Sequence, residues 1–98
     1  MDDLQASVFR VAELLKTLSH SDRLLIACAL AKGEMSVGQI QSELSIYQPN
    51  LSRHLTVLKA ARIVTFRKEG LSVFYRLSDE KAGQVIAALH HIYCERKE

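Results

Sequence analysis

The sequence predicts a mainly α-helical domain with one β-hairpin: four helices, then the two strands of the hairpin, then a fifth helix. Apolar residues recur at intervals of three and four up to about residue 61, which is helical spacing. Between residues 63 and 77, β-branched and aromatic residues follow the period of two that strands show, and helical spacing then returns. With 98 residues and no linker or repeat, the chain has room for a single domain, 1–98.

The first two helices are recognised from their capping residues and their apolar stripes. Asp2 or Asp3 is the expected N-cap of the first helix. The second helix is expected to begin near Ser19 or Ser21 and to stop at Gly33, since glycine is common just past a helix end. The stripe of the first helix consists of Leu4, Val8, Val11, Leu15 and Leu18.

A short helix and a longer one follow, separated by a tight break. Ser36 is the expected N-cap of a third helix over Val37–Leu44. The break is Ser45-Ile46-Tyr47, and Pro49 suits the first turn of the fourth helix, where its missing N–H costs nothing. This fourth helix is expected to end near Ala61.

The hairpin and the last helix complete the chain. The strands are expected over 63–67 and 72–77, with Glu69-Gly70 in the turn between them. The last helix is expected over about 79–96, with Ser78 as its N-cap.

The net charge of +2 is small, but the charge is unevenly divided along the chain. Residues 1–43 carry −2, residues 44–78 carry +5 and residues 79–98 carry −1. A basic middle third between acidic flanks favours a surface that meets a polyanion, whereas an ordinary solvated face is the alternative interpretation.

The helices within about 36–61 and the basic hairpin within about 63–77 together predict a winged helix-turn-helix. Burial of Leu51, Leu55 and Leu58 would turn small polar residues and one arginine of the fourth helix outward, where they reach base edges. Basic residues at the hairpin tip would reach the backbone or the minor groove. The candidate DNA-binding residues are Gln48, Asn50, Ser52, Arg53, His54, Thr56, Arg67 and Lys68.

Two other function classes compete with DNA binding. A winged-helix module that binds only proteins is expected to have a neutral or acidic recognition face, whereas Arg53 stands on this one, flanked by Lys59 and the basic hairpin. An enzyme is not expected, because the sequence holds no nucleophile elbow, phosphate loop, HExxH motif or closely spaced carboxylate pair.

Nearly the whole chain resembles bacterial repressors of the ArsR/SmtB family. The resemblance rests on residues 18–24 (LSHSDRL), 33–40 (GEMSVGQI), 48–55 (QPNLSRHL), 67–70 (RKEG) and 73–75 (VFY). It implies a homodimer built from helices about 3–18 and 79–96, bound to an inverted-repeat operator in double-stranded DNA and released by an inducer. Two positions depart from the family pattern: Tyr47 stands where a Ser or Thr cap is usual, which leaves the helix start frayed or capped by Ser45, and Arg62 replaces a usual Gly.

The metal sites of the family are incomplete in this sequence. Arsenic-sensing members carry Cys-x-Cys in the third helix, where this chain has Ser36 and Gly38. Zinc-sensing members use Asp, His, His and Glu of the last helix, and here Lys81 and Ile92 replace the two histidines, although Asp79 remains. We therefore expect no metal and no cofactor. The alternative is a metal-responsive repressor whose ligands come from the last helix: His90, His91, Cys94 and Glu95.

The two cysteines resemble those of the dithiol branch of the family, the sulfide- and persulfide-responsive regulators of BigR, SqrR and HlyU type. Cys28 lies in the second helix and Cys94 in the last. The resemblance implies a redox switch, in which an oxidant or reactive sulfur species links the two thiols and releases DNA. The alternative is that Cys28, between two alanines, only fills the core.

The N-terminus and the hydropathy favour a cytoplasmic protein. Residues after Met1 show no signal-peptide pattern, and the longest apolar stretch, Leu24–Ala31, is far shorter than a membrane span. Two cysteines are too few for a disulfide scaffold and suit a reducing compartment.

Overall fold

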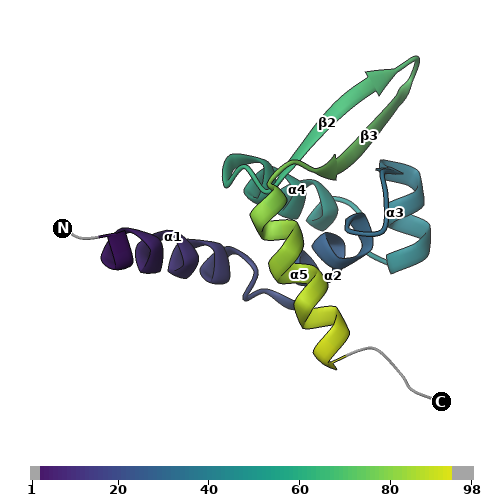
Figure 1. Ribbon diagram of the computed structural model, residues 1–98. Coiled ribbons are helices and arrows are strands. Elements are labelled where there is room, and N and C mark those ends of the chain that lie inside the picture. Colours follow the sequence, from purple (N-terminus) through teal and green to yellow (C-terminus); the bar gives the residue numbers. More distant parts are fainter. Residues whose placement is uncertain (1–2, 94–98) are drawn as a thin grey trace.

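The computed structural model describes residues 3–93, and its elements follow the expected order with one additional short strand. The hairpin rises from one side of a group of helices, and the first helix projects away from that group (Figure 1). The prediction of a mainly helical winged helix-turn-helix is confirmed. The elements are α1 (Asp3–Thr17), α2 (Ser21–Leu30), β1 (Met35–Ser36), α3 (Val37–Leu44), α4 (Asn50–Ala60), β2 (Val64–Glu69), β3 (Ser72–Leu77) and α5 (Glu80–Tyr93).

The ends of α2 and α3 show which capping predictions were right. α2 begins at Ser21, as expected, and His20 is its N-cap: its Nδ1 accepts a hydrogen bond from the Asp22 N–H. The prediction for α3 is confirmed, because Ser36 and Gln39 form a reciprocal capping box.

The later helix ends also differ in part from expectation. Arg62 has a φ of 64°, so a non-glycine residue does occupy the left-handed region after α4, as the sequence predicted. This conformation lowers the stability of the folded state by about 1 kcal/mol relative to glycine. Ser78 was wrongly predicted as the cap of α5, because its hydroxyl donates to the Arg62 carbonyl instead. Asp79 serves that role: its Oδ1 accepts from the backbone N–H groups of Lys81 and Ala82.

A three-stranded antiparallel sheet replaces the expected two-stranded hairpin. The strand order is β1-β3-β2, with Met35 opposite Tyr75 and Ser36 opposite Phe74. The added strand β1 therefore ties the chain segment before α3 to the middle of β3. β2 and β3 pair along their whole length, and Gly70 turns the chain at the tip with a φ of 64°.

One hydrophobic core joins α2, α3, α4, α5 and the base of the sheet. The burial of α4 is confirmed as expected, with Leu51, Leu55 and Leu58 inside. Among residues 3–93, the buried apolar residues are Leu18, Ile26, Ala27, Leu30, Met35, Ile40, Ile46, Leu51, Leu55, Leu58, Ile63, Val64, Ala82 and Ile86.

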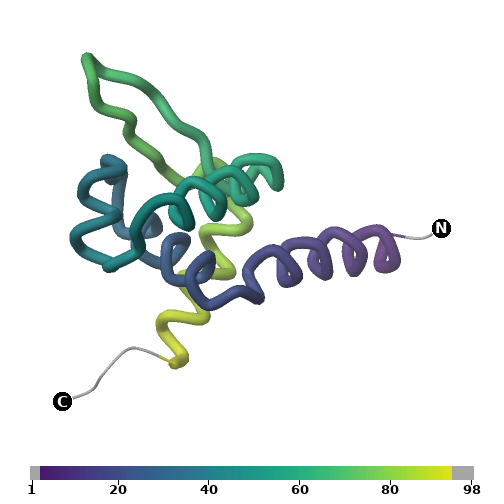
Figure 2. Tube along the Cα trace, turned by 180° about the vertical axis from the view of Figure 1, so that it is seen from behind, coloured from purple at the N-terminus to yellow at the C-terminus, as the bar shows by residue number. Residues whose placement is uncertain are grey.

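Helix α1 takes almost no part in this core. None of its residues is buried, and seen from behind it extends away from the other helices (Figure 2). Within residues 3–93, no helix is long and apolar enough to cross a membrane.

Candidate nucleic-acid interface

The outward face of α4 is polar, as its buried leucines require. Asn50, Ser52, Arg53 and Thr56 are exposed, while the three leucines on the opposite side hold the helix against the core. The arrangement gives one arginine and several short hydrogen-bonding side chains on a fixed helix, which is the chemistry that reads base edges in a major groove.

The start of α4 is held by Gln48. Its Oε1 accepts from the Ser52 N–H at 3.0 Å and from the Ser52 hydroxyl at 2.7 Å. Ser45, which the sequence suggested as a cap of this helix, instead ends α3 in the left-handed conformation. Gln48 and Ser52 therefore hold each other in place at the N-terminal edge of the outward face, where backbone N–H groups also attract phosphates.

His54 lies on the inner side of α4, unlike the other candidate DNA-binding residues of this helix. Its side chain is only 12% exposed, and its ring centroid lies 4.4 Å from that of His20. Its Nε2 lies 3.7 Å from Asp22 Oδ2. Burial lowers the pKa of His54, nearby His20 and Arg23 lower it further, and Asp22 acts in the opposite direction. His54 thus joins the recognition helix to the beginning of α2.

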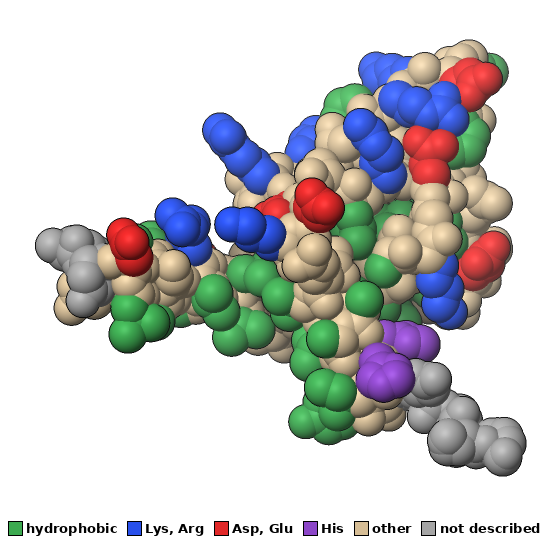
Figure 3. Space-filling model, in the orientation of Figure 1, with side chains coloured by type: hydrophobic (Ala, Val, Ile, Leu, Met, Phe, Trp, Pro, Cys, Tyr) green, Lys and Arg blue, Asp and Glu red, His purple; other side chains and the backbone are tan. Residues whose placement is uncertain are grey.

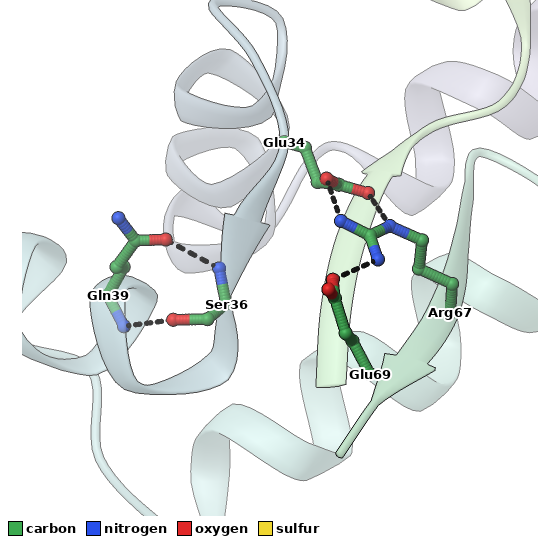
Figure 4. Close-up of polar contacts among 5 residues, drawn as sticks. All are labelled: Glu34, Ser36, Gln39, Arg67 and Glu69. Atoms are coloured by element: carbon green, nitrogen blue, oxygen red, sulfur yellow. Dashed lines mark hydrogen bonds and ion pairs between the residues drawn. The ribbon is translucent and has the colours of Figure 1, made fainter. Parts of the chain in front are cut away.

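Arg67 of the wing is held by two carboxylates (Figure 4). Its Nε and one terminal nitrogen each donate to Glu34 at 2.9 Å, and the other terminal nitrogen donates to Glu69 at 2.7 Å. The guanidinium carbon also lies 4.7 Å from the centre of the Phe74 ring. This pairing lowers the pKa of Glu34 and raises that of Arg67. Sequence reasoning missed it, because Glu34 and Arg67 are 33 residues apart and β1 was not foreseen.

Basic side chains gather toward the wing and the neighbouring part of the body (Figure 3). Lys68 is exposed on β2, one residue past Arg67. Lys59, near the end of α4, places its amine 4.5 Å from the centre of the Phe66 ring on the wing. The positive charge predicted for residues 44–78 therefore spans α4 and the wing as one surface.

Cys28 is half-buried in α2, next to α5. It lines two adjoining hollows, of about 180 and 450 Å³, and His90 of α5 lines both. Lys32 lies at the same place. Cys94, the second residue of the predicted switch, is outside the described residues, and so is Glu95.

The alternative metal ligands on the last helix are only partly visible. His90 is half-buried beside Cys28, and His91 is exposed, while Cys94 and Glu95 lie outside residues 3–93. Within the described residues, the histidines and carboxylates that do converge are His20, Asp22 and His54. Sequence reasoning did not connect them, since nothing in the local pattern shows that residues 20 and 54 meet.

Comparison with known proteins assigns the family. The model of the bacterial regulatory proteins of the arsR family matches residues 20–65. The biofilm growth-associated repressor of Agrobacterium fabrum is 51% identical over 88 residues, which cover 90% of this chain and 75% of that protein. This chain belongs to the ArsR family. The resemblance predicted from the sequence motifs is thereby confirmed.

Solved structures of this ArsR family agree with the fold. Reduced HlyU from Vibrio cholerae has a TM-score of 0.91 at 36% identity, covering 97% of this chain and all of that chain. The repressor BigR from Xylella fastidiosa has a TM-score of 0.89 at 44% identity, covering 96% of both chains. The homodimeric winged helix-turn-helix domain of Mb0332 from Mycobacterium bovis has a TM-score of 0.77 at 28% identity, covering 100% of this chain and 94% of that domain. The resemblance to the branch of BigR and HlyU is therefore also confirmed.

Proposed function

We propose that this ArsR-family chain is a homodimeric transcriptional repressor that binds an inverted-repeat operator and releases it when Cys28 and Cys94 are linked. The observation that carries the DNA-binding part is the polar face of α4, with Arg53 exposed beside a basic wing on a winged-helix scaffold. Asn50, Ser52, Arg53 and Thr56 would meet base edges and Gln48 the phosphates nearby, whereas Arg67 and Lys68 would meet the backbone.

A second copy of the chain is the partner that α1 requires. An isolated helix of fifteen residues is marginal in water, and no residue of α1 is fully buried, with Leu14 packing partly buried against the core. Hydrophobic side chains gather along one side of α1 and near the end of α5 (Figure 3). The exposed large apolar residues of these two helices are Leu4, Val8, Phe9, Val11, Leu15, Ile92 and Tyr93. A dimer through α1 and α5 would cover them and set two recognition helices in symmetry, as an inverted repeat requires.

The position of Cys28 supports the dithiol switch. His90 of α5 borders the same hollows as Cys28, and Cys94 follows His90 by four residues, the spacing at which helical side chains share a face. Lys32 and His90 line the same hollow as the thiol, and in thiol–disulfide chemistry the thiolate is the attacking species.

Formation of the link between the two thiols requires a two-electron oxidant. Two thiols give up two protons and two electrons as the S–S bond forms. Peroxide would accept them and become two waters, whereas an organic hydropersulfide would be reduced to its thiol and hydrogen sulfide. A covalent link from Cys28 in α2 to Cys94, which follows the last residue of α5 in the sequence, would then shift the scaffold on which α4 rests, since α2 packs against both α4 and α5.

DNA binding is tested by the salt dependence of affinity for the protein's own promoter DNA. Each phosphate contact releases counterions, so the logarithm of the binding constant is expected to fall linearly and steeply with the logarithm of salt concentration. Undetectable or salt-independent binding would contradict the proposal and favour a protein-interaction module.

The link is tested by intact-mass analysis of the protein before and after treatment with hydropersulfide or peroxide. A loss of two hydrogens indicates a direct disulfide, and added sulfur together with a loss of two hydrogens indicates a bridge through extra sulfur atoms. If the mass stays unchanged while DNA is released, the proposed link is wrong.

A further inference from the structure

The junction of α2 and α4 contains a group of side chains that the dithiol switch does not use. His20 precedes α2, Asp22 lies in its first turn, and His54 reaches them from the inner side of α4. One ligand atom from each lies within 4.8 Å of the others, and His54 Nε2 is 3.7 Å from Asp22 Oδ2. We propose that His20, Asp22 and His54 form a binding site for a divalent transition-metal ion of the zinc type.

The donor set suits such an ion. Two imidazole nitrogens and one carboxylate oxygen are ligands that zinc, cobalt and nickel share, and a fourth position held by water would complete a tetrahedron. In a tetrahedral zinc site, neighbouring ligand atoms are about 3.3 Å apart, as bond lengths of about 2.0 Å require. The distances between the three atoms must therefore shorten by up to about 1.5 Å, which rotations of the exposed His20 and half-buried Asp22 side chains would supply.

Burial and access also suit a ligand site. His54 is fixed, because its side chain is only 12% exposed and its ring packs against His20. The Asp22 side chain is 42% exposed, so the site opens to solvent on that side and an ion can enter. Arg23 is the cation nearest in sequence, and its Nε donates to the Thr17 carbonyl at 2.7 Å, toward the end of α1.

Metal binding has a specific local consequence at the start of α2. The Nδ1 of His20 now accepts a hydrogen bond from the Asp22 N–H at 3.1 Å. A neutral imidazole has a single nitrogen with a free electron pair. If Nδ1 binds the ion, the cap bond is lost; if the other nitrogen binds it, Nδ1 carries the proton and cannot accept. Coordination by His20 therefore breaks the cap bond in either case, and the Asp22 amide reports it.

A metal ion at this site would act on the recognition helix α4 independently of Cys28. His54 follows Arg53 directly on α4, but points inward while Arg53 points to solvent. An ion held by all three ligands would tie α4 to the beginning of α2 without covering the outward face. The proposal goes beyond the dithiol switch and does not depend on it.

The experiment uses the full chain with both thiols removed, as C28S/C94S, so that thiolates cannot supply ligands. Cobalt(II) and zinc(II) are added, and binding is followed by the visible absorption of cobalt, by equilibrium dialysis and by the amide resonance of Asp22. One equivalent of metal is expected to bind through nitrogen and oxygen ligands, with a shift of that resonance.

Matched variants separate this site from the one on the last helix. His20→Asn keeps a capping acceptor while removing the imidazole, and Asp22→Asn keeps the shape of an exposed side chain. Each is expected to weaken metal binding at least about tenfold without loss of the helical spectrum. The control variant H90Q/H91Q is expected to bind metal as before. The proposal is overturned if C28S/C94S takes up no metal, if either asparagine variant binds metal unchanged, or if the H90Q/H91Q control loses it.

Discussion

Arg67 on the wing and Glu34 before β1 form a two-point contact, with two N–H groups of the guanidinium on the two carboxylate oxygens at 2.9 Å each. The contact fixes the wing relative to the segment that enters the helix-turn-helix. It also occupies a guanidinium that our account assigns to the DNA backbone. If Arg67 contacts DNA, its guanidinium must leave these carboxylates and bind phosphates instead. Otherwise Arg67 stays paired with Glu34 and holds the wing in position for Lys68, the next residue.

Glu34→Gln tests which of these roles Arg67 has. If Arg67 meets phosphate, removing the competing charge is expected to tighten operator binding a few-fold at low salt, with a smaller gain at high salt. The measurement is fluorescence anisotropy of labelled operator DNA across a salt series. Glu13→Gln removes the same charge from α1 and is the control. Weaker binding by Glu34→Gln would mean that the contact supports the wing and that Arg67 does not reach DNA.

The ion pair also predicts how Glu34 titrates. Arg67 holds the pKa of Glu34 below its ordinary value of 4.5. Because the folded-state pKa is the lower one, the pair contributes to the folded wing above the ordinary pKa and is lost as pH falls through the lowered value. Arg67→Gln is expected to raise the pKa of Glu34, as followed by carbon NMR of the side-chain carboxyl. An unchanged titration would show that the contact does not persist in solution.

Arg53 and Lys68 are expected to differ in what they contribute to DNA binding. Arg53→Ala should cost about 1–3 kcal/mol on the operator and relax sequence preference, if the guanidinium reads a base. Lys68→Ala should weaken binding to all sequences alike and reduce the salt slope by about one, as loss of one phosphate contact does. Affinities for the operator and for scrambled DNA separate the two. Equal losses on both DNAs for Arg53→Ala would assign it to the backbone instead.

The exposed side of α1 predicts the oligomeric state. Phe9 is 66% exposed in the single chain, and a charge at this position would be buried without a partner in the dimer. Phe9→Asp is expected to give monomers by analytical ultracentrifugation and to weaken operator binding strongly. Leu71→Asp is the matched control for the oligomeric state alone, since Leu71 is a fully exposed apolar residue far from α1, at the wing tip. A dimer that survives Phe9→Asp would place the interface elsewhere.

The local elements could be predicted from the sequence because their signals are local. The stripe of Leu51, Leu55 and Leu58 predicted which side of α4 is buried, and Ser36 marked the start of α3. The alternation of residues 63–77 likewise predicted both strands of the wing.

The remaining features depend on contacts between distant segments. Strand β1 is two residues long and exists only through its pairing with β3, so no periodicity marks it. No local pattern marked His20 as the cap of α2, and its ring meets His54, 34 residues later along the chain. Arg67 was expected to face DNA alone, and its partner Glu34 is brought near only by the sheet.

The most direct test of the central claim is operator release by oxidised sulfur in single-cysteine variants. Operator affinity of the wild-type chain, Cys28→Ser and Cys94→Ser is measured under reductant and after hydropersulfide treatment. Our account predicts that all three bind the operator equally well under reductant. Only the wild-type chain is expected to lose affinity after treatment, by at least about tenfold, and to regain it on reduction. Loss of affinity in both single-cysteine variants after the same treatment would contradict the account.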